Sequence, residues 1–422
     1  MLIITIVFII GYVLIAVEHN IKVDKAATAL VTGVLCWLLF YLGNQSNAES
    51  EKMLLEHLGE ISAILFFLLG AMTIVEVIDT HDGFRIITDI IRTRSKPMIL
   101  ILISVITFFL SAILDNLTTS IVMTSLSGKL LSERTDRLWF ASMIIIAANA
   151  GGAWSPIGDV TTTMLWIGGQ ITPGDIVIKT FMPSLAVMIV PLCVLLFKFK
   201  GQEIGREGDT DKADHPAESN VILFSGVGLL IFVPLFKTIT HMPPFMGMLI
   251  ALGVMWIISS LIHFRKHHEE RLKYSVTNAL RRIDTSSILF FLGILLAVSA
   301  LQSVGALRQL SNFTSGYIKN EYLIGTILGL FSAIIDNVPL VAAAQGMFGL
   351  DMYPANHVFW EFLALSAGTG GSAIIIGSAA GVAVMGIEKI NFFWYLKNVS
   401  ILALLGFFAG LGTYILQQWI LV

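Results

Sequence analysis

The hexapeptide SAILDN at Ser111–Asn116 recurs almost unchanged as SAIIDN at Ser332–Asn337. Both copies lie inside long apolar stretches, where one charged carboxylate at the centre of a bilayer costs about 3 kcal/mol or more. Polar motifs in equivalent places of the two halves of a membrane protein are typical of a duplicated fold whose halves meet at a site near the membrane midplane. The repeated Asp-Asn pair therefore predicts both the architecture and the place of the functional site.

The composition of the chain is that of a polytopic membrane protein. Of its 422 residues, 56% are hydrophobic and only 13% are charged, whereas about 25% of residues are charged in a soluble protein. The net charge of −3 gives no support for a nucleic-acid partner, and two cysteines in apolar segments give none for a disulfide framework. The apolar run Met1–Val17 has no basic n-region and no small-residue cleavage site, so we interpret it as a retained first span and not as a signal peptide.

Apolar stretches long enough to cross a bilayer predict an all-α fold. Two further stretches, 97–131 and 320–350, carry the Asp-Asn pairs at mid-length. Each is either one kinked span or a re-entrant hairpin with the pair at its tip. The other candidate spans lie at about 1–17, 26–42, 60–78, 138–169, 178–198, 220–239, 243–263, 285–303, 357–387 and 393–420.

The distribution of Lys and Arg favours hairpins. We expect a multi-pass protein of the cell's inner (plasma) membrane. If both motif stretches are hairpins and the chain starts outside, both termini lie on the outer side of this membrane and most basic residues lie on the cytoplasmic side. A full span over 97–131 would instead separate Lys129 and Arg134 from the basic cluster at Arg85–Lys96. The basic residues that this topology leaves outside are Lys52, Lys179, Lys237, Arg308 and Lys319.

The two halves are predicted to be inverted repeats, each with five transmembrane helices and one re-entrant hairpin. Besides the Asp-Asn pairs, SAILFF at Ser62–Phe67 matches SSILFF at Ser286–Phe291, and Gly151-Gly152 matches Gly370-Gly371. The segment near residue 60 begins outside and its counterpart near 285 begins inside, so the halves are antiparallel. We expect a first repeat at 1–198 (hairpin 97–131, broken helix 138–169), a flexible cytoplasmic linker at 199–219, and a second repeat at 220–422 (hairpin 320–350, broken helix 357–387), with both helices broken at the midplane.

Two polar clusters in the first half offer ligands for a hard cation. At the predicted tip of the first hairpin, a carboxylate is combined with amide and hydroxyl oxygens, and hard cations prefer oxygen ligands. This first cluster consists of Asp115, Asn116, Thr118, Thr119 and Ser120. The second cluster lies among glycines that interrupt a span, and irregular backbone is tolerated at membrane depth where it lines a cavity. The alternatives are a helix-capping turn and a Pro/Gly kink whose hydroxyls bond back to their own helix. The second cluster consists of Asn149, Ser155, Asp159, Thr161 and Thr162.

The second half repeats both clusters with one substitution. Ser378 takes the place of Asp159, so the four clusters together contain three acids and no Lys or Arg. That composition favours a cation over an anionic substrate. The repeated clusters consist of Ser332, Asp336 and Asn337 at the second tip and of Ser372 and Ser378 in the second break, and the carboxylates predicted to hold Na⁺ are Asp115, Asp159 and Asp336.

These motifs resemble those of the ion transporter superfamily, which includes divalent-anion/sodium symporters, arsenite permeases and NhaD-type sodium/proton antiporters. The tips read DNLTTS and DNVPLV, each followed by a Gly-rich break, and this pattern looks like the NhaD type over essentially the whole chain. The resemblance implies a homodimer that works by an elevator motion, in which a hairpin-bearing transport domain moves against a scaffold. It also implies binding positions at Asp115, Asn116, Asn149, Asp159, Thr161, Thr162, Ser332, Asp336, Asn337 and Ser372.

We therefore expect a secondary active transporter in the lipid bilayer, without enzyme activity or a cofactor, that exchanges Na⁺ (or Li⁺) for H⁺. The nearest alternative is an arsenite or carboxylate/Na⁺ permease of the same superfamily. A passive cation channel and an intramembrane aspartyl protease are more distant alternatives. His263, His267 and His268 at a cytoplasmic helix end form either a solvated basic rim or a pH sensor, since histidine titrates near neutral pH.

Overall fold

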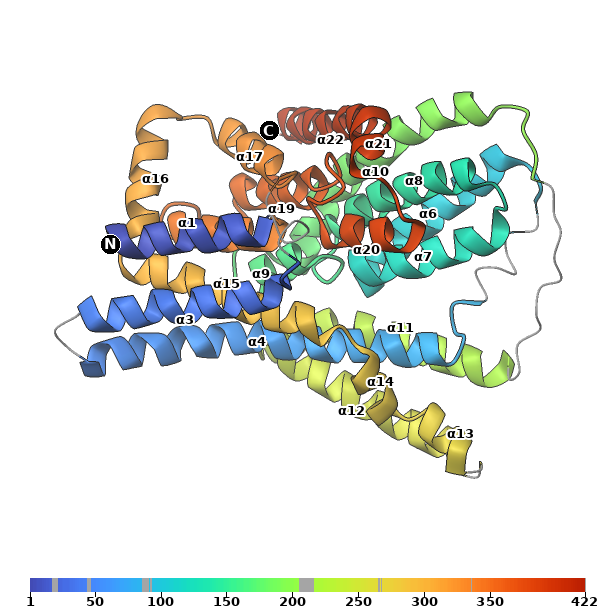
Figure 1. Cartoon of the computed structure of the whole chain (residues 1–422), viewed down its shortest axis with the longest axis horizontal. Coiled ribbons are helices and arrows are strands. Elements are labelled where there is room, and N and C mark those ends of the chain that lie inside the picture. The colour runs from blue at the N-terminus through green and yellow to red at the C-terminus, as the bar shows by residue number, and fades with distance from the viewer. Residues whose placement is uncertain are drawn as a thin grey trace.

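The computed structural model describes residues 1–16, 22–43, 47–85, 91, 93–204, 216–264, 266, 268–334 and 336–421. Throughout these residues the regular secondary structure is helical, apart from an isolated bridge between Ser95 and Glu203. Most helices run roughly along the long axis of the molecule and pack side by side (Figure 1). The described chain is therefore all-α, as predicted.

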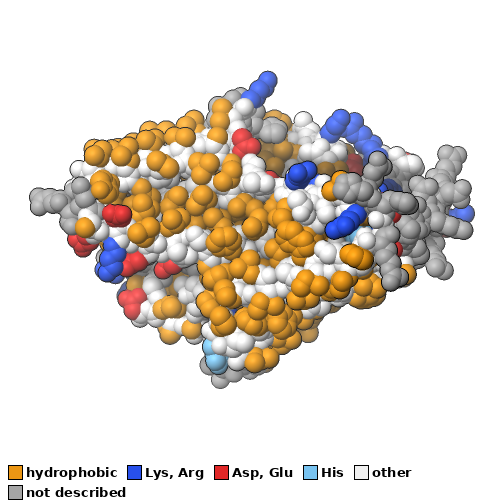
Figure 2. All heavy atoms as spheres, turned by 90° about the horizontal axis from the view of Figure 1, so that it is seen from below, with side chains coloured by type: hydrophobic (Ala, Val, Ile, Leu, Met, Phe, Trp, Pro, Cys, Tyr) orange, Lys and Arg blue, Asp and Glu red, His pale blue; other side chains and the backbone are white. Residues whose placement is uncertain are grey.

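Eight helices in the described part of the chain are long and apolar enough to cross a membrane, which confirms the prediction of a polytopic membrane protein. Hydrophobic side chains cover much of the face shown in Figure 2. Continuous apolar surface of this extent is suited to lipid and not to water. The eight helices are α3 (Lys25–Gly43), α4 (Asn47–Thr80), α6 (Lys96–Leu114), α10 (Pro173–Phe199), α11 (Pro216–Thr240), α12 (Pro244–His263), α15 (Thr285–Ser303) and α22 (Ser400–Leu421).

Some helices differ from the predicted spans. α4 begins well before the predicted span at 60–78, because the polar segment before it is rich in Glu and Leu, which favour helix. The predicted span at 393–420 is divided at Val399, and α1 is shorter than a full span. The short helices that lie outside the hairpins and the broken helices are α1 (Leu2–Ala16), α13 (His268–Lys273), α14 (Val276–Arg282), α16 (Ala306–Tyr317) and α21 (Phe392–Asn398).

Among the helix pairs that join the first half of the chain to the second, α3 packs on α15, and α4 packs on α12. Gly293 lies so close to α3 that an added Cβ would be 2.4 Å from the carbonyl carbon of Ala29. At the other pair, a Cβ on Gly70 would be 2.6 Å from the side chain of Met248. The glycines at the two crossings lie one position apart when Ser62–Phe67 is aligned with Ser286–Phe291.

The chain turns back at each Asp-Asn pair. In the first half, α6 ends at Leu114, Asp115 caps both helices, and α7 (Asn116–Leu130) follows. Lys96 at the start of α6 pairs with Asp136 at the start of α8 (Arg134–Gly152), with 2.6 Å between Nζ and Oδ2. Both ends of the 97–131 stretch therefore lie at the same end of the molecule.

The second Asp-Asn pair lies between α17 (Glu321–Phe331) and α18 (Asn337–Met347). Glu321 at the start of α17 lies 3.7 Å from the ring of His357, and Phe348 after the end of α18 packs on Phe359. His357 and Phe359 both belong to the start of α19 (Val358–Gly370). The 320–350 stretch therefore also returns to the end where it began.

Both predicted breaks are present. The first separates α8 from α9 (Val160–Ile167), and the second separates α19 from α20 (Ala379–Glu388). Glycines let each broken helix approach its hairpin, because a Cβ on Gly151 would be 2.2 Å from the carbonyl oxygen of Phe108, and one on Gly370 would be 1.9 Å from that of Gly329. Across the halves, α7 packs on α20 and α18 packs on α9, so the two tips and the two breaks meet in the interior.

Candidate functional site

Asp159 is the carboxylate at the centre of this meeting point. It is 1% exposed and forms the N-cap of α9, where Oδ1 accepts hydrogen bonds of 2.8 Å from both N and Oγ1 of Thr161. Asn116 at the first tip donates from Nδ2 to Oδ2 of Asp159 at 2.6 Å. Asn337 at the second tip donates to the same carboxylate at 3.3 and 3.4 Å. One buried acid is therefore bound by asparagines of both tips.

Asn149 connects this acid to the second break. Its Oδ1 accepts a hydrogen bond of 3.1 Å from Asn116, and its Nδ2 donates to Ser372 Oγ at 2.9 Å and to Ser378 Oγ at 3.0 Å. Ser378 caps α20 with nearly the same backbone angles as Asp159 (φ −143°, ψ 151° against φ −145°, ψ 146°). The structure thus places Ser378 as the counterpart of Asp159, as the sequence predicts.

Three of the predicted hydroxyl ligands hold the hairpins and caps in place instead of facing the centre. Ser332 donates to the carbonyl oxygen of Ala367 at 2.7 Å, and Ser155 donates to that of Ala112. Thr162 donates to the carbonyl oxygen of Asp159 at 2.8 Å. For these three side chains the structure shows the backbone-bonded arrangement, because broken helices leave carbonyl groups that need donors.

The other two acids have partners of their own. Asp115 caps α7, accepting from Thr118 N at 2.7 Å and from Thr118 Oγ1 at 2.9 Å. Asp336 accepts from Val338 N at 3.3 Å and lies 3.9 Å from Lys25 Nζ. Within the described residues, no group of three His, Cys, Asp or Glu side chains could hold one metal ion. Joint coordination of Na⁺ by all three carboxylates therefore remains a prediction.

Buried hydroxyls on α7 continue the polar surface away from Asn116. The hydroxyls of Thr119, Ser120, Thr124 and Ser127 are buried and have no hydrogen-bond partner among the described residues. Unpaired hydroxyls of this kind ordinarily bind water. The sequence analysis included Thr119 and Ser120 in the polar cluster of the first tip but not Thr124 and Ser127, although these two follow Ser120 at helical spacings of four and three residues.

Two charged contacts were also missed from the sequence. Lys25, which the topology assigned to a cytoplasmic loop, lies beside the second tip. Glu361 in α19 is fully buried and contacts Lys179 Nζ at 2.7 Å and Tyr414 OH at 2.7 Å. Both contacts join residues that are far apart in the chain, so no local pattern indicated them.

His263 is buried and is not part of a solvated rim. It is 2% exposed, and its Nε2 lies 2.7 Å from Nε2 of His81, whose Nδ1 lies 2.6 Å from the carbonyl oxygen of Val77. Burial lowers the pKa of His81 below its ordinary value of 6.5. Of the other two candidates, His268 is the first residue of α13 and His267 lies outside the described residues.

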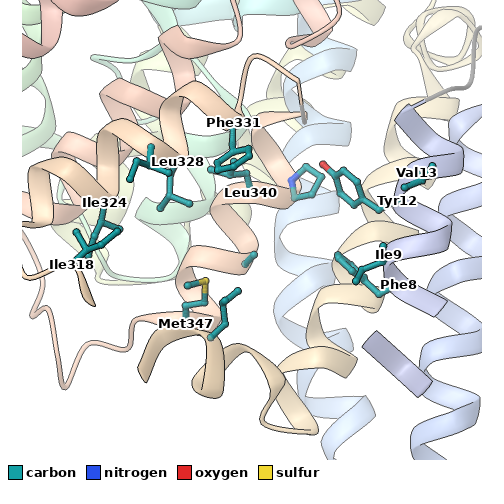
Figure 3. Close-up of a pocket in the computed structure, with 14 residues that line it drawn as sticks. Phe8, Ile9, Tyr12, Val13, Ile318, Ile324, Leu328, Phe331, Leu340 and Met347 are labelled. Carbon is teal, nitrogen blue, oxygen red and sulfur yellow. The ribbon is translucent and has the colours of Figure 1, made fainter. Parts of the chain in front are cut away.

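A separate apolar cavity of about 520 Å³ lies between α1 and the second hairpin (Figure 3). Its lining includes Phe8, Ile9, Phe331 and Leu340, and Tyr12 is the one lining residue with a side-chain oxygen. This cavity therefore lacks the ligands that a cation needs, and the polar centre around Asp159 remains the candidate site.

Comparison with known proteins identifies the family. A family model described as citrate transporter (CitMHS) matches residues 12–370. Sodium/proton antiporter 2 of Arabidopsis thaliana is 45% identical over 413 residues, which cover 97% of each chain. Sodium/proton antiporter 1 of the same plant is 46% identical over 97% of this chain and 71% of its own length. The Na(+)/H(+) antiporter NhaD of Vibrio cholerae is 30% identical over 97% of this chain and 90% of its own length.

The family model and these relatives span most of the chain, including both tips and the first break. The family and the relatives are transporters and not enzymes. Their agreement with the repeated Asp-Asn motif and the all-α membrane fold supports the resemblance seen in the sequence. The chain therefore belongs to the citrate transporter family and is a member of the ion transporter superfamily of the NhaD type.

Proposed function

We propose that this protein exchanges Na⁺ (or Li⁺) for H⁺ across the plasma membrane. The observation that carries the proposal is the buried carboxylate of Asp159, to which the asparagines of both tips donate. No Lys or Arg in the described residues forms an ion pair with Asp159. The relatives named sodium/proton antiporters agree with this substrate.

The chemistry of exchange follows from the cost of a buried charge. A desolvated carboxylate without a paired cation is unfavourable, so it binds either a proton or a metal cation. Asn116 and Asn337 each carry a carbonyl oxygen beside the amide that now donates to Asp159. Rotation of these amides would present oxygen ligands to Na⁺ in place of N–H donors. Na⁺ binding and proton release would then be coupled at one site, with Asp115 and Asp336 as further ligands.

A carboxylate permease is the second candidate, because the family model is described as citrate transporter. The site favours the cation. An organic anion needs a positive charge or several donors, whereas the centre holds an acid surrounded by amides and by the hydroxyls of Ser372 and Ser378.

The proposed cycle is an elevator motion in a homodimer. The scaffold would comprise α3, α4, α12 and α15, and the transport domain would comprise both hairpins and both broken helices. Matching contacts in the two halves, such as those of Gly151 and Gly370 with their hairpins, support two inverted repeats at 1–198 and 220–422 joined by the 199–219 linker. Both termini would lie outside.

The test is flux in proteoliposomes. With an imposed Na⁺ gradient and an internal pH dye, the purified protein should move protons against the direction of Na⁺ movement, and Asp159→Asn should abolish this movement. Uptake of labelled citrate, measured in the same vesicles, separates the second candidate. Citrate uptake without Na⁺-driven proton movement would refute exchange.

A further inference from the structure

The second hairpin tip provides fewer hydrogen-bond donors to its acid than the first. At the first tip, Asp115 accepts from both the backbone N–H and the hydroxyl of Thr118. The corresponding position in the second tip is Pro339, which has neither group. Asp336 has one backbone donor among the described residues, Val338 N at 3.3 Å. Its carboxylate therefore needs another source of stabilisation.

A lysine from the proposed scaffold supplies it. Lys25, the first residue of α3, places Nζ 3.9 Å from Oδ2 of Asp336 and 4.6 Å from the ring centroid of Phe290 on α15. The side chains of Lys25 and Asp336 are 23% and 17% exposed. Because the pair is partly shielded from water, its attraction exceeds that of a fully exposed pair.

Within the described residues, the first tip has no counterpart of this lysine. α12 corresponds to α3, since α12 packs on α4 in the first half as α3 packs on α15 in the second. α12 begins with Pro244, preceded by Pro243, where α3 begins with Lys25. Lys25 therefore lies beside Asp336, which has one backbone donor among the described residues. Asp115, which accepts two hydrogen bonds from Thr118, has no such lysine within the described residues.

The paired acid is also linked to the central site. Asn337, the residue after Asp336, donates to the carboxylate of Asp159. A movement of the second tip toward a cation beside Asp159 would carry Asp336 with it. Such a movement would bring Asp336 toward the cation and away from Lys25.

We propose that Lys25 is a positioning residue that competes with the transported cation for Asp336. Without the cation, the ammonium group neutralises the carboxylate and holds the second tip against the scaffold. When the cation recruits Asp336, Lys25 is released and the contact between hairpin and scaffold is broken. This inference rests on the proposed function and adds to it a link between cation binding and hairpin release.

The experiment measures Na⁺ binding without transport, as the thermal stabilisation of purified protein in detergent at rising Na⁺ concentration. Lys25→Met removes the competitor and should lower the apparent Kd for Na⁺ by about two- to five-fold, the range expected of a partly exposed pair. Lys25→Arg keeps the charge and should bind Na⁺ like the wild type. In an Asp336→Asn background, Lys25→Met should have no further effect. The matched control is Lys52→Met, at a lysine that is 79% exposed and pairs with Glu56.

The following results would overturn the proposal or separate it from the proposed function. The proposal is overturned if Lys25→Met binds Na⁺ no more tightly than the wild type, or if the gain persists in the Asp336→Asn background. If Lys25→Met fails to fold, Lys25→Gln makes the same comparison with a polar side chain. A wild-type protein that binds no Na⁺ would refute the proposed function and this inference together. If the wild type binds Na⁺ and Lys25→Met binds it with the same apparent Kd, only the competition between Lys25 and the cation is refuted.

Discussion

Asp159 and Ser378 occupy corresponding caps, yet only Asp159 carries charge. We expect Asp159→Ser to weaken the apparent Na⁺ affinity by about a hundredfold or more, because losing a charge partner in a desolvated site costs about 3 kcal/mol. Ser378→Ala should cost less than about tenfold, because its hydroxyl is a neutral group that accepts from Asn149 and Gly381 N and that water can replace. The measurement is Na⁺ affinity at several pH values. A larger effect of Ser378→Ala would place the cation nearer the second break.

At Asp115, a substitution by Asn can remove the negative charge and keep the hydrogen bond that caps α7. Its backbone has φ 108° and ψ 161°, a region that costs about 1–3 kcal/mol for a residue with a side chain. Asn tolerates positive φ and still accepts from Thr118 N, so Asp115→Asn should keep expression and thermal stability. We expect it to abolish Na⁺-driven proton movement, because it removes a cation ligand that exchanges protons. Near wild-type exchange would restrict Asp115 to capping.

The contact between His81 and His263 should be sensitive to acid. Val77 accepts from Nδ1 of His81, so neutral His81 offers Nε2 as the acceptor for His263, and a second proton would place two N–H groups face to face. Because the pKa of His81 is lowered in the folded protein, the stability that this contact contributes is present above its ordinary value of 6.5 and is lost as pH falls below it.

Thermal unfolding in detergent between about pH 7.5 and about pH 5 checks this expectation. The wild type should lose thermal stability on the acid side, and the double variant His81→Gln/His263→Gln should lose less. His241→Asn is the control, since His241 is exposed and has a positive φ that Asn tolerates. If acid lowers the thermal stability of the double variant as much as that of the wild type, the contact between His81 and His263 does not contribute to the pH response.

Among the helices, the close approach of each broken helix to its hairpin depends on glycine. Gly370→Ala should destabilise the protein by at least about 2–3 kcal/mol, because the new Cβ would overlap the backbone of Gly329 and force α17 and α19 apart. Gly151→Ala should do the same between α6 and α8. Gly412→Ala in α22 is the control, since a Cβ there meets no atom within 4 Å and Ala favours helix. Thermal stability in detergent tests all three, and a fully stable Gly370→Ala protein would contradict the observed approach.

The topology of the entire chain can be tested at the first hairpin. Lys96 and Asp136 bring both ends of the 97–131 stretch together, so single cysteines at Thr93 and Ser132 should both be labelled only from the cytoplasm. The background should lack Cys193, which is exposed, while Cys36 is buried. Lys52→Cys should be labelled only from outside. Labelling of Thr93→Cys and Ser132→Cys from opposite sides of the membrane would contradict the predicted hairpin, and the inverted-repeat topology that depends on it would be wrong as well.

Much of the fold was readable from the sequence because its determinants are local. The length of an apolar stretch decides whether a helix can span the bilayer, and Gly and Pro decide where it breaks. The breaks after Gly152 and Gly370 and the turns at Asp115 and Asp336 therefore lie where the sequence predicts them. The early start of α4 was missed because helix propensity extends beyond the apolar part of a span.

The sequence by itself determined that this is an all-α membrane protein and which polar side chains are available at its centre. Only the tertiary structure decided which of them meet. Asp159 receives the asparagines of both tips, whereas Asp115 caps its own helix and Asp336 faces Lys25. The physical reason is that composition and motif spacing act within one helix, while a contact across the chain depends on how helices rotate and cross when they pack.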